Sequence, residues 1–325
     1  MMKKNVILYL CCLALLAACE SNSDPQTDRG ESVPLTISGL SLTEETASSR
    51  VSPGVVTTDG ATIGVSQLAF NGYMPAYNQA YTYSSADGGW SSATPLFVDA
   101  RQAKIVGVYD PNNVGAFPPA NTGLVSNTNL TAQLYDETKV WYFDNTNTTV
   151  NNVNSTVAFK MKPTYSRMTL QIERDASYLS DCKITEVTLL SGGVFYNDLP
   201  LDVSTGTLQG SATAYNATTN PMLTKAEGFV TIPTGTTTAQ SIDLLLPPQV
   251  VQTSGLVLSI KVDGQARSVT IPYASLSKLE PAMQYNIPLK IVGPATLTIN
   301  GAFTGQAWNT TPTTAGTVTD SSGMN

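Results

Sequence analysis

The stretch that decides the fold is Leu256-Val257-Leu258-Ser259-Ile260-Lys261-Val262-Asp263-Gly264-Gln265-Ala266-Arg267-Ser268-Val269-Thr270-Ile271. Apolar and polar side chains alternate up to Val262, which is typical of a β-strand with one buried face. The Asp263-Gly264 pair favours a tight hairpin turn. The sequence therefore predicts an antiparallel hairpin in which Arg267–Ile271 is the return strand.

Other short runs of the chain show the same period-two pattern, and Gly, Pro, Asn and Asp separate them. They are Val33-Leu35-Ile37 before Gly39, Lys104–Tyr109 before the turn Asp110-Pro111-Asn112-Asn113, Val157-Phe159, and Met168-Leu170-Ile172. Charged residues make up only 13% of the chain, too few for long amphipathic helices. We therefore predict an all-β fold of antiparallel sandwiches.

The length of 325 residues allows two domains of ordinary size. The Asn/Thr-rich stretch from Asp144 to Thr156 is the best candidate for the junction between them. It is equally compatible with a hydrated loop inside one domain.

The amino terminus carries the features of a lipoprotein signal peptide. Lys3 and Lys4 precede an uncharged apolar run, Val6–Ala18. A helix needs about 20 such residues to span a bilayer core, so the run fits a cleaved secretory signal better. Leu15-Leu16-Ala17-Ala18-Cys19 has the form of a lipobox. We predict cleavage before Cys19, lipidation of Cys19 and a polar tether after it.

Charge argues against nucleic acid as a partner. The net charge is -7, and removal of Lys3 and Lys4 leaves 15 basic against 24 acidic side chains, or -9. A phosphate backbone is bound by clustered Lys and Arg side chains. We expect no nucleic-acid partner.

The chain contains no histidine, which excludes a Ser-His-Asp triad, a Cys-His pair and histidine-ligated zinc. Cys182 is the one cysteine after Cys19, and we predict that it is a buried small hydrophobe. Carboxylate-only catalysis remains possible in principle, and the candidate acids are Asp99, Asp110, Glu173 and Asp175. No phosphate-binding or calcium-binding loop is present. We predict a protein that is not an enzyme, with no catalytic residue, cofactor or metal site.

Three blocks of the sequence carry a family resemblance in their order and spacing. The first is Tyr81-Thr82-Tyr83 with Asp87-Gly88-Gly89-Trp90, followed by Ala103–Pro111. The second is Thr156–Met161 with Ser166–Leu170, and the third comprises Leu245–Gln249, Asp263-Gly264 and Met283–Leu289. Together these blocks resemble the fimbrillin-like proteins, the type V pilins of Bacteroidales. One departure is that many members carry a histidine where this chain has Pro163 or Thr164.

The resemblance implies two transthyretin-like β-sandwiches in a protein carried to the outer membrane by its lipid. It also implies that a trypsin-like protease removes the lipidated segment with the first strand, and that a strand of a neighbouring fimbrial subunit fills the gap. The boundaries implied are 1–18 for the signal peptide, 19–50 for the tether and removable strand, 51–152 for the first sandwich and 153–325 for the second.

The sequence offers residues for each step of this scheme. The removable strand is 33–42, with Val33, Leu35, Ile37, Leu40 and Leu42. The cleavage site is Arg50-Val51; cutting at Arg29 would leave the strand attached. The donor-strand candidates are Leu297, Ile299 and Phe303, which are equally compatible with the last strand of the second sandwich.

Three functions fit the sequence. The first is a structural pilin that polymerises by donor-strand exchange into a surface fimbria and supports adhesion. The second is a tip or anchor subunit, which would keep its lipid and first strand or lack a free donor tail. The third is a surface glycan-binding lipoprotein in which Trp90 and Trp141 would stack on sugars.

Overall fold

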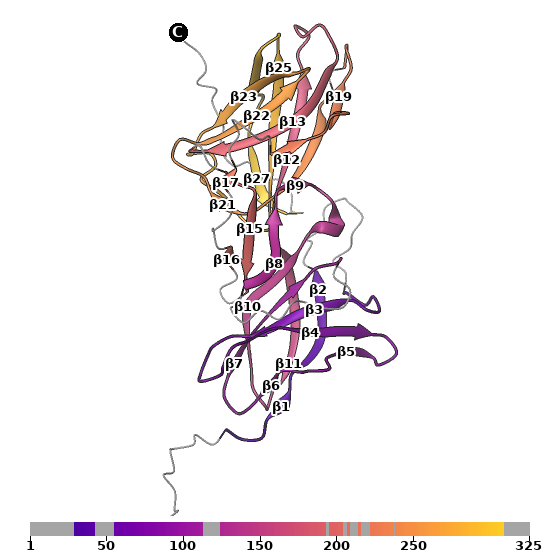
Figure 1. The fold of residues 1–325 in the computed structure, drawn as a ribbon, viewed down its shortest axis with the longest axis vertical. Coiled ribbons are helices and arrows are strands. Elements are labelled where there is room, and N and C mark those ends of the chain that lie inside the picture. Colours follow the sequence, from indigo (N-terminus) through magenta and orange to yellow (C-terminus); the bar gives the residue numbers. More distant parts are fainter. Residues whose placement is uncertain are drawn as a thin grey trace, which may run out of the picture.

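The structure is a computed structural model that describes residues 29–42, 55–112, 124–192, 195–203, 207–208, 214–215, 222–236 and 238–308. The predicted all-β fold is confirmed, because strands dominate these residues and the one helical element is the short 3-10 helix η1 (Glu137–Lys139). The molecule is elongated, with the earlier strands at one end and the later strands at the other (Figure 1).

The predicted hairpin is present. Strand β22 (Leu256–Val262) pairs antiparallel with β23 (Gln265–Ile271), and Val262 lies opposite Gln265. Buried and half-buried residues alternate along β22. Asp263 and Gly264 both have positive φ, 48° and 82°, the backbone that a two-residue turn of this kind requires.

A seven-stranded sheet forms the first end of the molecule. In spatial order its strands are β2 (Thr36–Leu42), β11 (Thr156–Pro163), β10 (Tyr142–Val150), β7 (Ala103–Tyr109), β3 (Thr62–Gln67), β4 (Ala76–Ser84) and β5 (Gly89–Ser91). A small separate pair consists of β1 (Val33–Pro34) and β6 (Phe97–Val98). Their buried side chains form one hydrophobic cluster, which we call the first core.

A six-stranded and a five-stranded sheet form the other end. The six-stranded sheet contains β26 (Thr296–Ile299), β25 (Met283–Val292), β12 (Ser166–Arg174), β20 (Gln240–Leu246) and β9 (Gln133–Leu134), with β27 (Thr304–Ala307) also on β25. The five-stranded sheet contains β18 (Leu223–Thr224), β13 (Cys182–Ser191), β22 and β23, with β19 (Val230–Ile232) on β13. Their inner faces form a second hydrophobic cluster, the second core.

Short strands complete the structure. β8 (Leu124–Thr131), β15 (Asp198–Asp202) and β16 (Thr207–Leu208) form a three-stranded sheet, β14 (Phe195–Tyr196) pairs with β17 (Ala214–Tyr215), and β21 (Gln249–Val250) pairs with β24 (Lys278–Leu279). β8 and β15 lie between the two ends in Figure 1. Leu201 of β15 and Leu245 of β20 pack into the first core, so later parts of the chain contribute to both ends.

The sequence predicted antiparallel pairing, but two of the strand pairs are parallel. β2 pairs parallel with β11, and β12 pairs parallel with β25. Parallel neighbours need long connections, and each of these pairs joins strands that are far apart in the sequence. Local alternation does not reveal such partners, which explains the difference.

The Asn/Thr-rich stretch from Asp144 to Thr156 is neither a linker nor simply a loop. Its first part continues β10 to Val150 and pairs with β7, with an irregularity between Asp144 and Thr148. The buried Asp144 carboxylate accepts a hydrogen bond from the backbone N–H of Lys160 at 2.6 Å. This bond joins β10 to β11 just beyond their last paired residues, Phe143 and Lys162.

Strand β11 lies in the first core, whereas the predicted boundary at residues 152 and 153 assigned it to the second sandwich. Its alternate residues Val157, Phe159 and Met161 are buried there. The packing changes after Pro163, because β12 begins at Ser166 and faces the second core. We propose that the junction lies at Thr164 and Tyr165.

Candidate functional site

The candidate site is the leading segment, residues 29–42, together with the strands that hold it. Its main element, β2, is the edge strand of the seven-stranded sheet and pairs along its length with β11. Near its end, Ser41 also forms an isolated antiparallel bridge with Val55. The leading segment thus lies at the edge of a sheet whose other strands all follow it in the chain.

The predicted inward face of the leading segment is buried. Leu35, Ile37 and Leu40 are 3%, 4% and 0% exposed and belong to the first core. Val33 and Leu42 pack against the same core and are half-buried. Burying a side chain of this size contributes roughly 1.5–3 kcal/mol, so these residues stabilise the first core substantially.

The backbone of the leading segment changes partners between Leu35 and Thr36. Val33 and Pro34 pair antiparallel with β6, and the Leu35 N–H donates to the Leu96 carbonyl at 2.7 Å. From Thr36 onward the partner is β11, beginning with the bond from the Thr36 N–H to the Ser155 carbonyl at 2.8 Å. One extended segment therefore joins two sheets.

Tyr81 lies at this change of partner. Its side chain is 1% exposed, and its hydroxyl accepts from the Leu96 N–H at 2.9 Å and donates to the Leu35 carbonyl at 3.5 Å. Burial raises the pKa of Tyr81, so its hydroxyl stays protonated and can serve as a donor.

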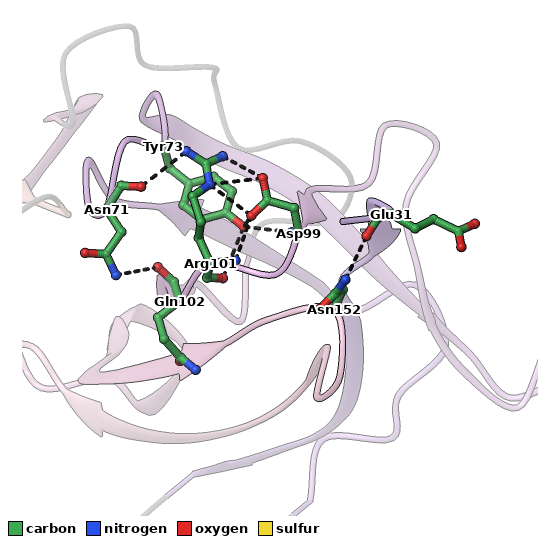
Figure 2. A network of polar contacts seen from close by, with 7 residues as sticks. All are labelled: Glu31, Asn71, Tyr73, Asp99, Arg101, Gln102 and Asn152. Atoms are coloured by element: carbon green, nitrogen blue, oxygen red, sulfur yellow. Dashed lines mark hydrogen bonds and ion pairs between the residues drawn. The ribbon is translucent and has the colours of Figure 1, made fainter. Parts of the chain in front are cut away.

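The start of the leading segment is held by backbone contacts. The Arg29 carbonyl accepts from the Ala100 N–H at 2.9 Å, and the Glu31 carbonyl accepts from Asn152 Nδ2 at 3.0 Å. Figure 2 shows Asn152 reaching the backbone of Glu31, while the Glu31 carboxylate points away. These bonds hold the backbone at Arg29 and Glu31.

A compact polar network fixes the loop that contains Ala100. Arg101 donates to both oxygens of Asp99, at 2.6 Å from Nη2 and 3.0 Å from Nε, and its guanidinium lies 4.2 Å from the centre of the Tyr73 ring. The Tyr73 hydroxyl donates to Asp99 Oδ1 and accepts from the Asp99 N–H, both at 2.7 Å (Figure 2). The hydrogen bonds from Arg101, and then that from Tyr73, hold the pKa of Asp99 well below its usual range.

We expect Asp99→Asn to lower stability at neutral pH by about 1 kcal/mol, a small value because water screens the partly exposed Arg101. A lowered folded-state pKa contributes stability above the unfolded value of about 3.9, and that contribution is lost as the pH falls further. The difference in stability between the wild type and Asp99→Asn should therefore shrink progressively as the pH falls from about 4 to 2. Urea unfolding from pH 7 to pH 2 measures this, with the exposed Asp87→Asn as control. An unchanged difference at all pH values would contradict the assignment.

The remaining predicted residues of the processing step lie outside the described residues. These are Cys19, Arg50 and Val51. Lipidation and cleavage therefore stay predictions from the sequence.

The predicted donor residues are engaged in their own chain. Leu297 lies in β26 opposite Ile291 of β25 and is buried in the second core, where the half-buried Ile299 also packs. Phe303 is buried and stacks on Tyr285 with ring centres 6.0 Å apart. The donor role stays a prediction, and it would require this segment to leave the second core.

The candidate acids have different surroundings, and within the described ranges no two of them share a partner. Asp99 bonds Arg101, Asp175 pairs with Lys290 at 3.0 Å, Glu173 accepts from Asn300 at 2.9 Å, and burial raises the pKa of Asp110. Among the described residues no group of three His, Cys, Asp or Glu side chains could hold a metal ion.

Cys182 is buried, as predicted, and burial raises the pKa of its thiol to about 11. A thiol of this kind stays protonated at neutral pH and is a poor nucleophile.

The two tryptophans of the predicted sugar platform lie in different surroundings. Trp141 is buried, so it offers no face to a sugar. Trp90 is half-buried and packs edge-on against Tyr83, with ring centres 5.6 Å apart. In the described part of the chain, no helix has the length and apolar character needed to cross a membrane.

The chain is similar to several solved structures, although no protein-family model and no curated protein matches it. One is a candidate cell adhesion protein from Bacteroides uniformis, with 16% identity, TM-score 0.48 and coverage of 85% of this chain and 98% of the other. Another is a fimbrial assembly protein from Parabacteroides distasonis, with 10% identity, TM-score 0.43 and coverage of 85% and 97%. A third is the tip fimbrial protein Mfa3 from Porphyromonas gingivalis, with 9% identity, TM-score 0.37 and coverage of 78% and 95%.

Proposed function

We propose that this chain is a structural subunit of a surface fimbria. It is exported as an outer-membrane lipoprotein anchored at Cys19, cut after Arg50 by a trypsin-like protease, and polymerised by strand exchange in support of adhesion. The observation that supports the proposal is the position of β2, an edge strand whose apolar side chains lie in the first core while the other strands of the sheet pair with one another in sequence β11-β10-β7-β3-β4-β5.

Loss of the leading segment would uncover both apolar and polar groups of β11. Val157 and Phe159 would lose the covering side chains of Ile37 and Leu40, and their carbonyls would lose the hydroxyl bonds from Ser38 at 3.3 Å and Ser41 at 3.2 Å. Each buried side chain is worth roughly 1.5–3 kcal/mol and each hydrogen bond about 1 kcal/mol net. This free energy becomes available to an incoming strand, which is the basis of strand addition at a sheet edge.

An exchange of this kind builds a filament because the interface is heterologous. One subunit presents the vacated edge of β11, and another presents a strand, so the contact repeats without closing on itself.

A position at one end of the fibre is the second candidate function. It is favoured by the burial of Leu297 and Phe303 in the second core of their own chain. A subunit with no free donor strand can accept a neighbour but cannot extend the fibre further. Electron microscopy of fibres bearing gold-labelled subunits distinguishes the positions, since an end subunit labels only fibre tips.

A reversible disulfide between β2 and β11 tests the proposed exchange. Thr36 and Thr156 are exposed partners in the parallel pairing of β2 and β11, and a Thr36→Cys/Thr156→Cys variant would join the two strands by a disulfide. After trypsin treatment, the oxidised variant should stay monomeric. Reduction should restore fibre formation to the wild-type level, as seen by electron microscopy and size-exclusion chromatography.

The control variant is Ser259→Cys/Ser268→Cys, whose disulfide would join two paired residues of the β22–β23 hairpin, far from the leading segment. It should form fibres with or without reductant. Fibres from the oxidised Thr36→Cys/Thr156→Cys variant would rule out displacement of β2. Absence of fibres from trypsin-treated wild type under all conditions would exclude polymerisation by this route.

A further inference from the structure

We propose that the folded protein protects the bond between Arg29 and Gly30 from a trypsin-like protease, although Arg29 is exposed. The protecting contacts come from the loop at Ala100 and the turn at Asn152, which bind the backbone on both sides of this bond. This inference rests on the proposed export and processing, and it specifies a basic residue at which the protease does not cut.

The position of Arg29 makes a cut there different from a cut after Arg50. The predicted lipid at Cys19 precedes Arg29, whereas β1 and β2 follow it. After a cut at Arg50, the lipidated segment would still be held in the sheet by β2, so the subunit would stay at the membrane until another strand replaced β2. After a cut at Arg29, nothing would join the lipid to the subunit. Protection of Arg29 therefore keeps the subunit at the membrane until exchange.

The carbonyl group that a protease must attack at Arg29 is already bound. Trypsin attacks the carbonyl carbon before the cut and holds the carbonyl oxygen with its own backbone N–H groups. In the folded protein the Arg29 carbonyl oxygen accepts a hydrogen bond from the Ala100 N–H at 2.9 Å. This bond must break before the oxygen can enter the protease.

The backbone after Arg29 is also held, and it is not extended at Gly30. Gly30 has φ +60°, in the left-handed region. It lies close to the turn, because a Cβ placed on it would be 3.1 Å from Asn152 Nδ2. The Glu31 carbonyl accepts from Asn152 Nδ2 at 3.0 Å, and Val33 pairs with Val98 of β6. A protease can bind this segment only after the segment has opened locally.

The loop and the turn that make these contacts are bound to each other. The Asn152 N–H donates to the Asp99 carbonyl at 2.8 Å. Ala100 lies between Asp99 and Arg101, whose side chains bond each other, and the Tyr73 hydroxyl bonds Asp99 (Figure 2). Exposure of the bond after Arg29 therefore requires either the loss of several contacts or the movement of the whole loop.

Trypsin digestion of the full chain tests the protection, with mass spectrometry measuring how fast each new amino terminus appears. The chain carries Arg50→Ala, which keeps the leading segment attached and makes the result independent of the proposed cut. The reference substrate is a peptide of residues 24–36, in which Arg29 is the one basic residue. We expect the cut after Arg29 to be at least about thirtyfold slower in the protein than in the peptide, because cleavage follows the population of the opened form.

Variants of the turn then assign the protection to its contacts. Asn152→Ala removes the side-chain bond to Glu31 and should speed the cut after Arg29 about fivefold. Val153→Ser is the matched control, since Val153 lies in the same turn and is 90% exposed, and it should leave the rate unchanged. Cleavage after the exposed Lys139 of η1 should proceed at one rate in all these proteins, which excludes general unfolding as the cause.

A variant of the loop gives a second test. Tyr73→Phe removes the hydroxyl that bonds Asp99 and should also speed the cut after Arg29. Cutting after Arg29 as fast in the protein as in the peptide would overturn the inference, whatever happens at Arg50. A slow cut that neither Asn152→Ala nor Tyr73→Phe accelerates would overturn the role of the turn and the loop. A protected Arg29 in a protein that never forms fibres would support this inference and contradict the proposed function.

Discussion

Arg50→Ala is expected to leave trypsin-treated protein monomeric and to reduce fibre yield at least tenfold. Arg50 precedes Val51 in the stretch that separates β2 from Val55, so cutting there frees the whole leading segment from the sheet that follows. Without the cut, the covalent link keeps β2 at a very high local concentration beside β11, and an incoming strand cannot compete. Amino-terminal sequencing and electron microscopy measure the two steps separately.

Arg29→Ala is the matched control, since Arg29 precedes the leading strand. The Arg29 carbonyl bonds Ala100, and a cut at this residue leaves β1 and β2 attached. Fibre yield from this variant should equal that of the wild type. Normal fibres from Arg50→Ala, with Val51 not exposed as a new amino terminus, would contradict cleavage after Arg50.

Gly255→Ala is expected to destabilise the second core by about 2–5 kcal/mol. Gly255 has φ +87°, which costs a residue with a Cβ about 1–2 kcal/mol. A Cβ there would also lie 2.5 Å from the backbone carbonyl oxygen of Ile271, and backbone cannot move aside as a flexible side chain does. Overpacking of this kind adds about 1–3 kcal/mol. Urea unfolding should show a lower midpoint.

Gly264→Ala separates the two contributions to this loss. Gly264 has a similar φ of +82°, but an added Cβ meets nothing within 4 Å. Only the conformational cost should remain, about 1–2 kcal/mol. Equal losses of stability in the two variants would show that the contact with Ile271 has no effect.

Local pattern was enough to predict individual strands. The hairpin at Asp263-Gly264 needed only alternation and a turn pair, because its two strands are neighbours in the chain. The inward face of the leading strand was also visible, since Leu35, Ile37 and Leu40 are large and apolar amid Thr, Ser and Gly. These features depend on contacts within a few residues.

Sequence reasoning missed the features that depend on distant partners. Val157, Phe159 and Met161 alternate clearly, yet nothing local says which core they enter. The Asp99 network was also missed, although Asp99 and Arg101 stand two residues apart. In the folded protein the Tyr73 hydroxyl and the Arg101 guanidinium both bond the Asp99 carboxylate. The loop fixed in this way then bonds the Arg29 carbonyl through the Ala100 N–H, and a local sequence pattern does not reveal that contact.

The chain's composition and its period-two apolar pattern were sufficient to predict a fold made of strands, the absence of histidine chemistry and an apolar strand near the start of the chain. These predictions need no knowledge of the fold. The edge position of β2, its parallel pairing with β11 and its bulge at Ser38 are visible only in the folded molecule. Pairing across more than a hundred residues depends on how the whole sheet closes, and no short window of sequence contains that information.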